Sequence, residues 1–190
     1  LPEMRRVEGT RLGIVGMGRI GRNVASRALS CGWEVVAFDP MMPVDPQRAA
    51  GVQPVGLDEL VATSDAITLH APLTEENHHL INAERLAATR DGVVIVNTSR
   101  GGLIDLDALH AALSAGKVSY AALDVLDGEP TPDLDHPLLT HPDVLVTSHT
   151  AWLSTQARLE LATSTAEEAI RYLDGASPRH LLNPDSLVHR

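Results

Sequence analysis

The sequence predicts an α/β fold in which a parallel β-sheet lies between two layers of helices. Segments typical of strands and of helices alternate along the chain with short connections, which is the pattern of a parallel sheet covered on both faces. Several strand segments are uninterrupted apolar runs, such as Val93-Val94-Ile95-Val96, and strands buried on both faces have this composition. A chain of 190 residues is long enough for an ample core, and we expect residues 1–190 to form a single domain.

Each element follows from its local composition. The segments expected to be strands are Arg11–Val15, Glu34–Phe38, Gly51–Pro54, Ala66–Leu69, Val93–Asn97, Tyr120–Asp124 and Val144–Thr147. The segments expected to be helices are Arg19–Cys31, Asp58–Ala62, Ala83–Thr89, Leu106–Ala115 and Thr155–Asp174. Asp105 can cap the fourth helix and Gly116 can end it. In the last helix, apolar residues recur at helical spacing and are expected to face the sheet: Ala162, Ala166, Ala169, Ile170 and Leu173.

A glycine-rich turn follows the first strand. The sequence Gly16-Met17-Gly18-Arg19-Ile20-Gly21 leads into a helix, and the next apolar strand ends at Asp39, eighteen residues after Gly21. Strand, glycine turn, helix, strand and acid in this order predict a dinucleotide site in a Rossmann fold, a doubly wound parallel sheet of three α/β/α layers. Gly16 allows the tight turn, Gly18 lets the backbone approach a pyrophosphate, and Gly21 lets helix and strand pack closely. The alternative is a glycine turn that binds no ligand.

The acid at the end of the second strand indicates which cofactor is bound. Asp39 suits the free 2′-hydroxyl of NAD and would repel the 2′-phosphate of NADP. The next residues, Pro40-Met41-Met42, offer no Arg or Lys to receive that phosphate. The sequence therefore predicts NAD as the cofactor, with its phosphates at the helix start.

Three further segments follow strands, at the sheet edge where α/β folds bind ligands. Asn97-Thr98-Ser99-Arg100-Gly101-Gly102 presents an arginine that either binds a carboxylate or is a surface residue. Asp124-Val125 leads to Asp127-Gly128-Glu129-Pro130, whose carboxylates are orienting partners or solvated turn residues. Ser148-His149-Thr150-Ala151-Trp152 offers a histidine, the usual acid/base near neutral pH, although a lone histidine after a strand is more often structural.

Taken together, these segments resemble the D-isomer-specific 2-hydroxyacid dehydrogenase family. The resemblance covers about residues 7–184 and also rests on His70-Ala71-Pro72-Leu73-Thr74 and Leu103-Ile104-Asp105. Trp152 after His-Thr-Ala resembles the branch that includes C-terminal binding protein, a dehydrogenase-like transcriptional corepressor.

The resemblance implies hydride transfer between NAD(H) and a small 2-hydroxy or 2-oxo acid. Arg100 would bind the substrate carboxylate, His149 would be the acid/base, and Glu129 would orient the imidazole. Trp152 would line the substrate pocket with Arg100. The residues implied to contact NAD are Gly16, Gly18, Arg19, Ile20, Gly21, Asp39, Pro40, His70, Ala71, Pro72, Thr74, Thr98, Ser99, Arg100, Asp124, His149 and Ala151.

The resemblance implies a two-domain enzyme in which the NAD-binding domain is inserted into a substrate domain. The leading part of that substrate domain has no counterpart in this sequence. Residues 179–190 are interpreted as a remnant of the return to that domain. We therefore expect a fragment or a freestanding domain that binds NAD(H) and turns over 2-oxo acids poorly by itself. A non-catalytic, NAD(H)-sensing dimerisation module of the corepressor kind remains an alternative. A Rossmann methyltransferase that binds S-adenosylmethionine would leave Arg100, Glu129 and His149 unexplained.

Composition restricts partners and location. The net charge of −10 argues against nucleic acid as a partner, and no apolar run is long enough for a membrane span. The single cysteine, Cys31, excludes an internal disulfide, fits a cytoplasmic location and is expected to be half-buried. The resemblance implies a homodimer.

His78-His79 have no Cys, Asp or further His nearby in the sequence, so we expect a solvated loop and no metal site.

Overall fold

The computed structural model describes residues 6–41 and 51–179. The chain divides into two compact units, the first ending at His149 and the second beginning at Thr150. Each unit is described by itself. Met42 and residues 180–190, which figured in the sequence-based expectations, lie outside the described residues.

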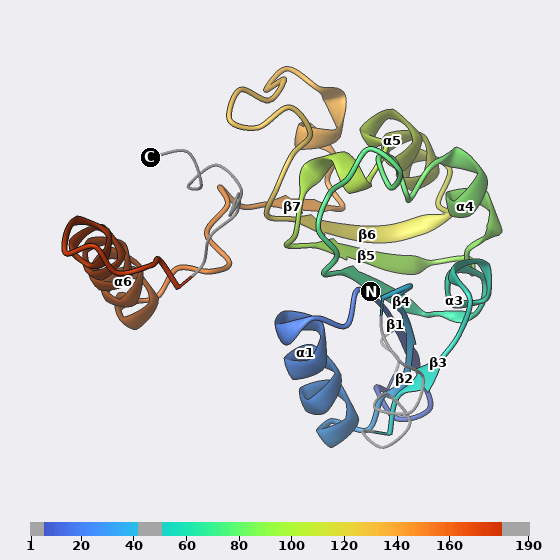
Figure 1. Cartoon of the computed structure of the whole chain (residues 1–190). Helices are drawn as coiled ribbons and strands as arrows, with labels where there is room; N and C mark the ends of the chain where they lie inside the picture. Colours follow the sequence, from blue (N-terminus) through green and yellow to red (C-terminus); the bar gives the residue numbers. More distant parts are fainter. Residues whose placement is uncertain (1–5, 42–50, 180–190) are drawn as a thin grey trace. The chain divides into compact units, whose positions relative to one another are not determined.

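The larger unit is built around a seven-stranded parallel sheet (Figure 1). Its strands are β1 (Arg11–Val15), β2 (Glu34–Phe38), β3 (Gln53–Pro54), β4 (Ala66–Leu69), β5 (Val93–Asn97), β6 (Val118–Leu123) and β7 (Val144–Val146). They lie in the order β3-β2-β1-β4-β5-β6-β7. The chain therefore builds the sheet outward from β1 in one direction and then outward from β4 in the other. The doubly wound parallel sheet that the sequence predicts is confirmed.

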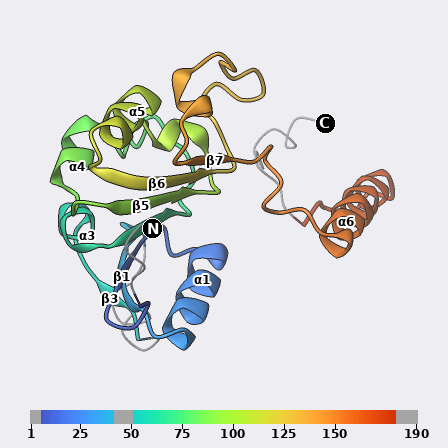
Figure 2. The ribbon, with the colours of Figure 1, turned by 180° about the vertical axis from the view of Figure 1, so that it is seen from behind.

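Helices cover both faces of this sheet, as seen from front and back in Figures 1 and 2. They are α1 (Arg19–Ser30), α3 (Leu57–Thr63), α4 (Ala83–Ala88) and α5 (Leu106–Ser114). Neighbouring residues of one strand point to opposite faces. Ile14 accordingly packs in the cluster that includes Ala25 of α1, whereas Val15 packs in the cluster that includes Leu60 of α3 and Leu109 of α5. The three-layer arrangement follows from this division of the core.

The predicted elements are present: strands β1, β2, β4 and β5 have the predicted bounds, and the ends of the other elements differ by at most two residues. Strand β3 begins at Gln53 rather than Gly51 because Gly51 has a φ of 78°, which an extended strand does not adopt. Strand β6 begins earlier than expected, at Val118, and its pairing with β5 shifts register between Val93 and Val94. Asp105 caps α5 by accepting a hydrogen bond from the backbone N–H of Ala108 at 3.0 Å.

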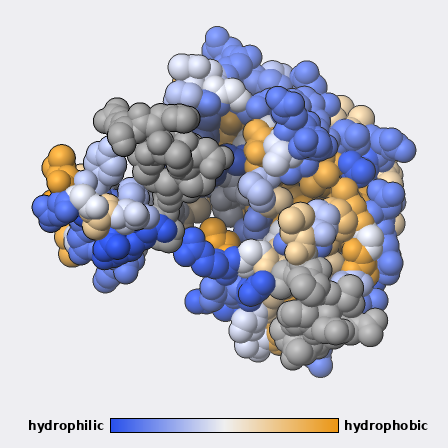
Figure 3. Space-filling model, in the orientation of Figure 1, coloured by the Kyte–Doolittle hydropathy of each residue, from blue (hydrophilic) through white to orange (hydrophobic). Residues whose placement is uncertain are grey.

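Not all of the sheet is covered by the helices of its own unit. Tyr120 of β6 is 45% exposed and Leu145 of β7 is 63% exposed. Figure 3 shows hydrophobic residues exposed among hydrophilic ones on the face of the larger unit that it presents. Cys31 is also exposed, so the expectation of a half-buried thiol is wrong; the residue ends α1, where the helix meets solvent.

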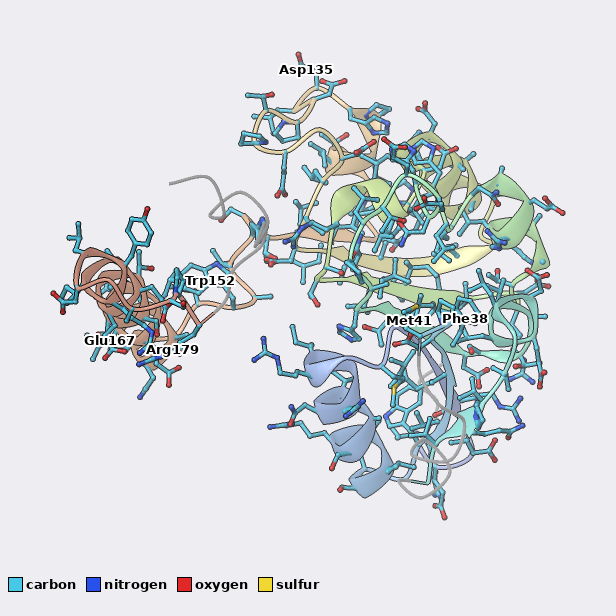
Figure 4. The ribbon with its side chains drawn as sticks, viewed as in Figure 1. Phe38, Met41, Asp135, Trp152, Glu167 and Arg179 are labelled. Atoms are coloured by element: carbon cyan, nitrogen blue, oxygen red, sulfur yellow. The ribbon has the colours of Figure 1, made fainter. Side chains whose placement is uncertain are left out.

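The second unit contains one long helix, α6 (Thr155–Leu173). The Ser154 hydroxyl caps it by accepting a hydrogen bond from the N–H of Ala157 at 3.0 Å. After the helix the chain turns back, and Arg179 pairs with Glu167 at 3.3 Å (Figure 4). No residue of α6, all of which is described, is buried, and Leu173 is 81% exposed. The expectation that its apolar residues face the sheet stays a prediction, because it concerns the placement of α6 against the other unit.

Candidate cofactor and active site

The glycine turn lies at the point where the strand order reverses. Gly16 has a φ of 92°, and a Cβ atom there would lie 2.7 Å from the backbone of His70, which follows β4. A Cβ on Gly21 would lie 2.0 Å from the carbonyl oxygen of Gly16. Both positions therefore require glycine for close backbone packing. By contrast, no described protein atom lies within 4 Å of a Cβ built on Gly18.

This difference separates Gly16 and Gly21, which are packed against backbone, from Gly18, which borders open space. Gly16 and Gly21 are buried, whereas Gly18, Arg19 and Ile20 are exposed. Among the described residues, no side chain caps the first turn of α1. The backbone N–H groups of that turn can therefore bind an anion, and the open space beside Gly18 lets a phosphate approach them.

Asp39 holds the turn from the end of β2. Its Oδ2 accepts a hydrogen bond from the N–H of Met17 at 2.7 Å, and its Oδ1 accepts one from the N–H of Met41 at 2.9 Å. A carboxylate can accept about four hydrogen bonds, so each oxygen retains capacity for a ribose hydroxyl.

The segment after β4 borders the same turn. The N–H of His70 donates to the carbonyl of Val15 at 2.7 Å, and its Nε2 lies 3.0 Å from the hydroxyl of Thr68. Burial lowers the pKa of His70, because the charged imidazolium loses hydration there. Asn77 then braces the exposed Pro72 and Thr74 through hydrogen bonds to their backbone at 2.7 Å each.

Asn97 shapes the turn that carries Arg100. Its side-chain amide donates to the carbonyl of Arg100 at 2.9 Å and accepts from the N–H of Ser99 at 3.0 Å. The hydroxyl of Ser99 donates to the carbonyl of Ala71, which ties this turn to the segment after β4. The guanidinium of Arg100 is exposed and uses Nη1 to bond the carbonyl of Ser99 at 2.7 Å, which leaves its other N–H donors for a ligand.

Glu129 and His149 form a close pair. Glu129 Oε2 lies 2.7 Å from His149 Nδ1, and Glu129 Oε1 accepts a hydrogen bond from the N–H of Leu126 at 2.9 Å. Because a carboxylate only accepts, His149 Nδ1 carries the proton of this bond. The Nε2 atom is then the ring nitrogen that can exchange a proton with another molecule. His149 has a φ of 55°, an uncommon backbone conformation for a residue other than glycine.

A continuous set of contacts joins this pair to the arginine turn. A Cβ on Gly101 would lie 1.9 Å from the backbone of Leu126, so the two segments touch through their main chains. The carbonyl of Asp124 accepts a hydrogen bond from the N–H of His149 at 2.8 Å, and the N–H of Asp124 donates to the carbonyl of Asn97 at 2.9 Å. The buried Asp124 side chain also accepts from the hydroxyl of Thr147.

Several residues at this edge of the sheet could not be identified as functional from the sequence. Asn97, Thr68 and Thr147 received no role, although each forms a hydrogen bond with a predicted site residue: Asn97 with Arg100, Thr68 with His70 and Thr147 with Asp124. One sequence feature could have identified Asn97: it is a polar residue at the end of the apolar run Val93-Val94-Ile95-Val96. A solvated loop was expected at His78 and His79 because no Cys, Asp or further His lies nearby in the sequence, but folding brings Asp127 Oδ2 to 3.6 Å from Nε2 of each histidine.

Ala151 and Trp152 belong to the second unit, and their contacts with NAD and substrate stay predictions. Both are exposed, Trp152 by 48%. Across 6–41 and 51–179, no helix is both long and apolar enough to cross a membrane.

The strand order, the glycine turn and the acid at the end of β2 define a dinucleotide-binding Rossmann domain of the NAD type. Comparison with known proteins supports this assignment. The family profile described as "D-isomer specific 2-hydroxyacid dehydrogenase, NAD binding domain" matches residues 2–151. The chain belongs to this family, as its NAD-binding domain.

Relatives of known function are similar over most of this chain. A glyoxylate reductase of Korarchaeum cryptofilum is 41% identical over 179 residues, which are 94% of this chain and 54% of the relative. A D-3-phosphoglycerate dehydrogenase of Archaeoglobus fulgidus is 38% identical over 95% of this chain and 34% of the relative. The chain thus spans about half, or less, of the length of the curated relatives it matches.

Solved structures show the same fold. The apo D-lactate dehydrogenase of Escherichia coli matches with a TM-score of 0.84 and 34% identity, over 94% of this chain and 55% of that one. The Aquifex aeolicus D-lactate dehydrogenase in complex with NAD and lactic acid matches with a TM-score of 0.83 and 32% identity, over 90% of this chain and 55% of that one.

Proposed function

We propose that this chain is the cofactor domain of an NAD-dependent oxidoreductase that transfers a hydride between NAD(H) and a small 2-hydroxy or 2-oxo acid. The observation that carries this proposal is the 2.7 Å contact between Glu129 Oε2 and His149 Nδ1. This contact holds the imidazole of His149 in one orientation. The same edge of the sheet also carries the glycine turn and Arg100. The names of the matched reductases and dehydrogenases support the substrate class.

The residues around the glycine turn fit NAD. The first turn of α1 would bind the pyrophosphate beside Gly18, and Asp39 would accept hydrogen bonds from the adenosine ribose. The segments at His70–Pro72 and at Thr98 would lie along the cofactor, with Asp124 near the nicotinamide amide. When bound, NADH supplies a hydride to the carbonyl carbon and NAD accepts it in the reverse direction.

His149 supplies the proton. In reduction, Nε2 donates a proton to the carbonyl oxygen as the carbon gains its hydride, and in oxidation the same atom accepts the hydroxyl proton. Glu129 holds Nδ1–H and thereby keeps Nε2 directed to the substrate. Its second oxygen bonds the N–H of Leu126 at 2.9 Å, so the carboxylate is fixed from two sides.

Arg100 binds the substrate carboxylate. A guanidinium can form two parallel charged hydrogen bonds with a carboxylate, which would fix the 2-oxo group relative to His149. Its Nη1 bond to the carbonyl of Ser99 holds the side chain close to its own turn. The contacts from Gly101 to Leu126 would keep the arginine and Glu129 at a constant separation.

The decisive experiment separates cofactor binding from chemistry. We expect His149→Asn to keep its affinity for NADH within a few-fold, measured by fluorescence titration. In the intact protein, we expect the same substitution to lower kcat for 2-oxo acid reduction by about 10²–10⁴-fold, the usual contribution of an acid/base group. Unchanged kcat in this variant, across a panel of small 2-oxo acids, would contradict the proposal.

The same experiment tests the non-catalytic alternative. An NAD(H)-sensing dimerisation module would bind NADH with similar affinity in the His149→Asn variant and would turn over no 2-oxo acid before or after the substitution. The built Glu129–His149 pair favours the enzyme, since sensing alone does not require an oriented acid/base group.

We also propose a homodimer in the cytoplasm that binds neither nucleic acid nor membranes. The family resemblance supports the homodimer, and the net charge of −10 opposes phosphate binding. Light scattering of the purified protein at micromolar concentration tests the dimer, and a monomer there would contradict it.

A further inference from the structure

We propose that His78, His79 and Asp127 bind a divalent transition-metal ion such as Zn²⁺, at a site separate from the cofactor turn. Asp127 Oδ2 lies 3.6 Å from Nε2 of His78 and 3.6 Å from Nε2 of His79. One donor atom from each of the three residues lies within 4.8 Å of the others. Two imidazoles and one carboxylate from two loops therefore converge on one point.

The spacing of these donor atoms suits a tetrahedral ion. Metal–ligand bonds of about 2.0–2.2 Å place two donors of a tetrahedral zinc site roughly 3.3–3.5 Å apart. The two separations from Asp127 Oδ2 are 3.6 Å and all three donor atoms lie within 4.8 Å of one another, so the side chains must draw closer together to reach that geometry. The two imidazole rings are stacked with centroids 3.9 Å apart, and Nε2 of each ring lies 3.6 Å from the same oxygen of Asp127.

Backbone contacts hold the three donors in place. His79 has a φ of 52°, and its N–H donates to the carbonyl of Gly102 at 2.7 Å. Asn77, just before the histidines, bonds the backbone of Pro72 and Thr74. Asp127 uses Oδ1 to accept from the N–H of Gly128 at 3.0 Å, which leaves Oδ2 facing the imidazoles.

Asp105 provides the outer partner that metal-binding histidines commonly have. Its Oδ2 lies 4.0 Å from Nδ1 of His79, whereas Asp127 lies near Nε2, the other nitrogen of the ring. Its Oδ1 caps α5 through the N–H of Ala108, so the carboxylate is held in place. A short movement would make a carboxylate–histidine–metal arrangement, which fixes the ring and strengthens binding.

The site opens into a hollow of about 270 Å³ lined by His79, Asp105, Asp127, Asp107, Asp133 and His136. A hollow of this size leaves room for water as the fourth ligand. The four carboxylates attract cations to it. Because imidazole nitrogen is a borderline donor, the set favours zinc and its transition-metal neighbours over magnesium and calcium.

A bound ion would fasten together two segments that approach the proposed active site. Asp127 lies two residues before Glu129, and the backbone partner of His79, Gly102, lies two residues after Arg100. The ion would therefore stabilise the native chain, because a preformed site of this kind is absent from the unfolded state.

The test is a titration of the untagged 190-residue chain with ZnCl₂ by calorimetry, with Co²⁺ as a visible probe. We expect one ion per chain, a raised Tm that a chelator reverses, and a Co²⁺ absorption band in the visible region. Asp127→Asn and His79→Asn should each lower the Zn²⁺ affinity at least tenfold. Asp105→Asn, which can still cap α5, should lower it about 10–100-fold.

The matched control is His110→Asn, which removes an imidazole outside the three ligands and should leave the affinity unchanged. Three results would overturn the proposal: no stoichiometric binding, unchanged affinity in both His79→Asn and Asp127→Asn, or an equal loss in the control. The Co²⁺ spectrum reports ligation directly, so a variant with a lowered Tm still distinguishes loss of a ligand from loss of the fold.

Discussion

Asp39 Oδ2 accepts a hydrogen bond from the backbone N–H of Met17 at 2.7 Å, so the acid that ends β2 fixes the centre of the glycine turn after β1. One carboxylate thus has two tasks. It shapes the turn that we propose binds the phosphates, and its remaining lone pairs are proposed to accept hydrogen bonds from the adenosine ribose.

Replacing Asp39 by Ala is expected to weaken NADH binding and to lower the preference for NADH over NADPH. Hydrogen bonds to a charged group contribute about 1.5–3 kcal/mol, so the loss of affinity should be roughly 10–100-fold. Fluorescence titration with both cofactors measures it. Asp39→Asn is the matched control, because it keeps one carbonyl acceptor without the charge that repels a 2′-phosphate. Unchanged selectivity in Asp39→Ala would remove Asp39 from the cofactor site.

Gly18 and Gly21 allow a paired test of the glycine turn. Gly18→Ala meets no described protein atom within 4 Å, so its stability should stay within about 0.5 kcal/mol of the wild type. Its new methyl group would nevertheless occupy the space beside the first turn of α1, and NADH affinity should fall at least about tenfold, or 1.4 kcal/mol. Isothermal calorimetry and thermal unfolding give the two values. Full NADH affinity in Gly18→Ala would contradict the proposed phosphate site.

Gly21→Ala is expected to behave in the opposite order. Its Cβ would lie 2.0 Å from the carbonyl oxygen of Gly16, so α1 must move away from the sheet. Forcing extra atoms into a packed site costs about 1–3 kcal/mol, and Tm should fall even without ligand. A Tm equal to that of Gly18→Ala would show that the helix and strand are not as close as described.

Glu129→Gln probes how His149 is oriented. If the Gln carbonyl keeps the hydrogen bond from the N–H of Leu126, its NH₂ group faces His149 Nδ1. A neutral imidazole then pairs with it only when the ring proton is on Nε2, which is the wrong tautomer for a base. We expect oxidation of a 2-hydroxy acid to slow by at least about 10²-fold in the intact protein, with NAD binding unchanged. An equal loss in NAD affinity would instead indicate a structural role.

The sequence predicted the sheet well because its strands are strongly apolar and its glycine turn has a fixed geometry. It could place Gly16, Asp39 and Arg100 at strand ends, since parallel strands share one carboxyl edge. The close pairing of Glu129 with His149 rested on the family resemblance, because residues twenty positions apart carry no local signal of contact.

Contacts between loops were harder to foresee. Asp127 is far from His78 and His79 in the sequence, and only folding of the segment after β6 brings its carboxylate between them. That the apolar residues of α6 face the sheet stays a prediction, because helical spacing shows which face of a helix is apolar and does not show what covers it.

His70 predicts a pH dependence of stability. Burial lowers its pKa in the folded protein below the unfolded value of about 6.5, so the unfolded state binds more protons in the window between the two. Stability must therefore fall as the pH drops below about 6.5, by at most about 1.4 kcal/mol per pH unit for this one group.

His70→Asn should show a shallower decline in stability than the wild type when urea unfolding is measured from pH 7.5 to 5.5. Thr68→Val is the control: it removes the hydroxyl beside Nε2 but leaves the imidazole buried, so it should keep the wild-type slope. If the Thr68→Val slope became as shallow as that of His70→Asn, the hydrogen bond rather than burial would control the titration.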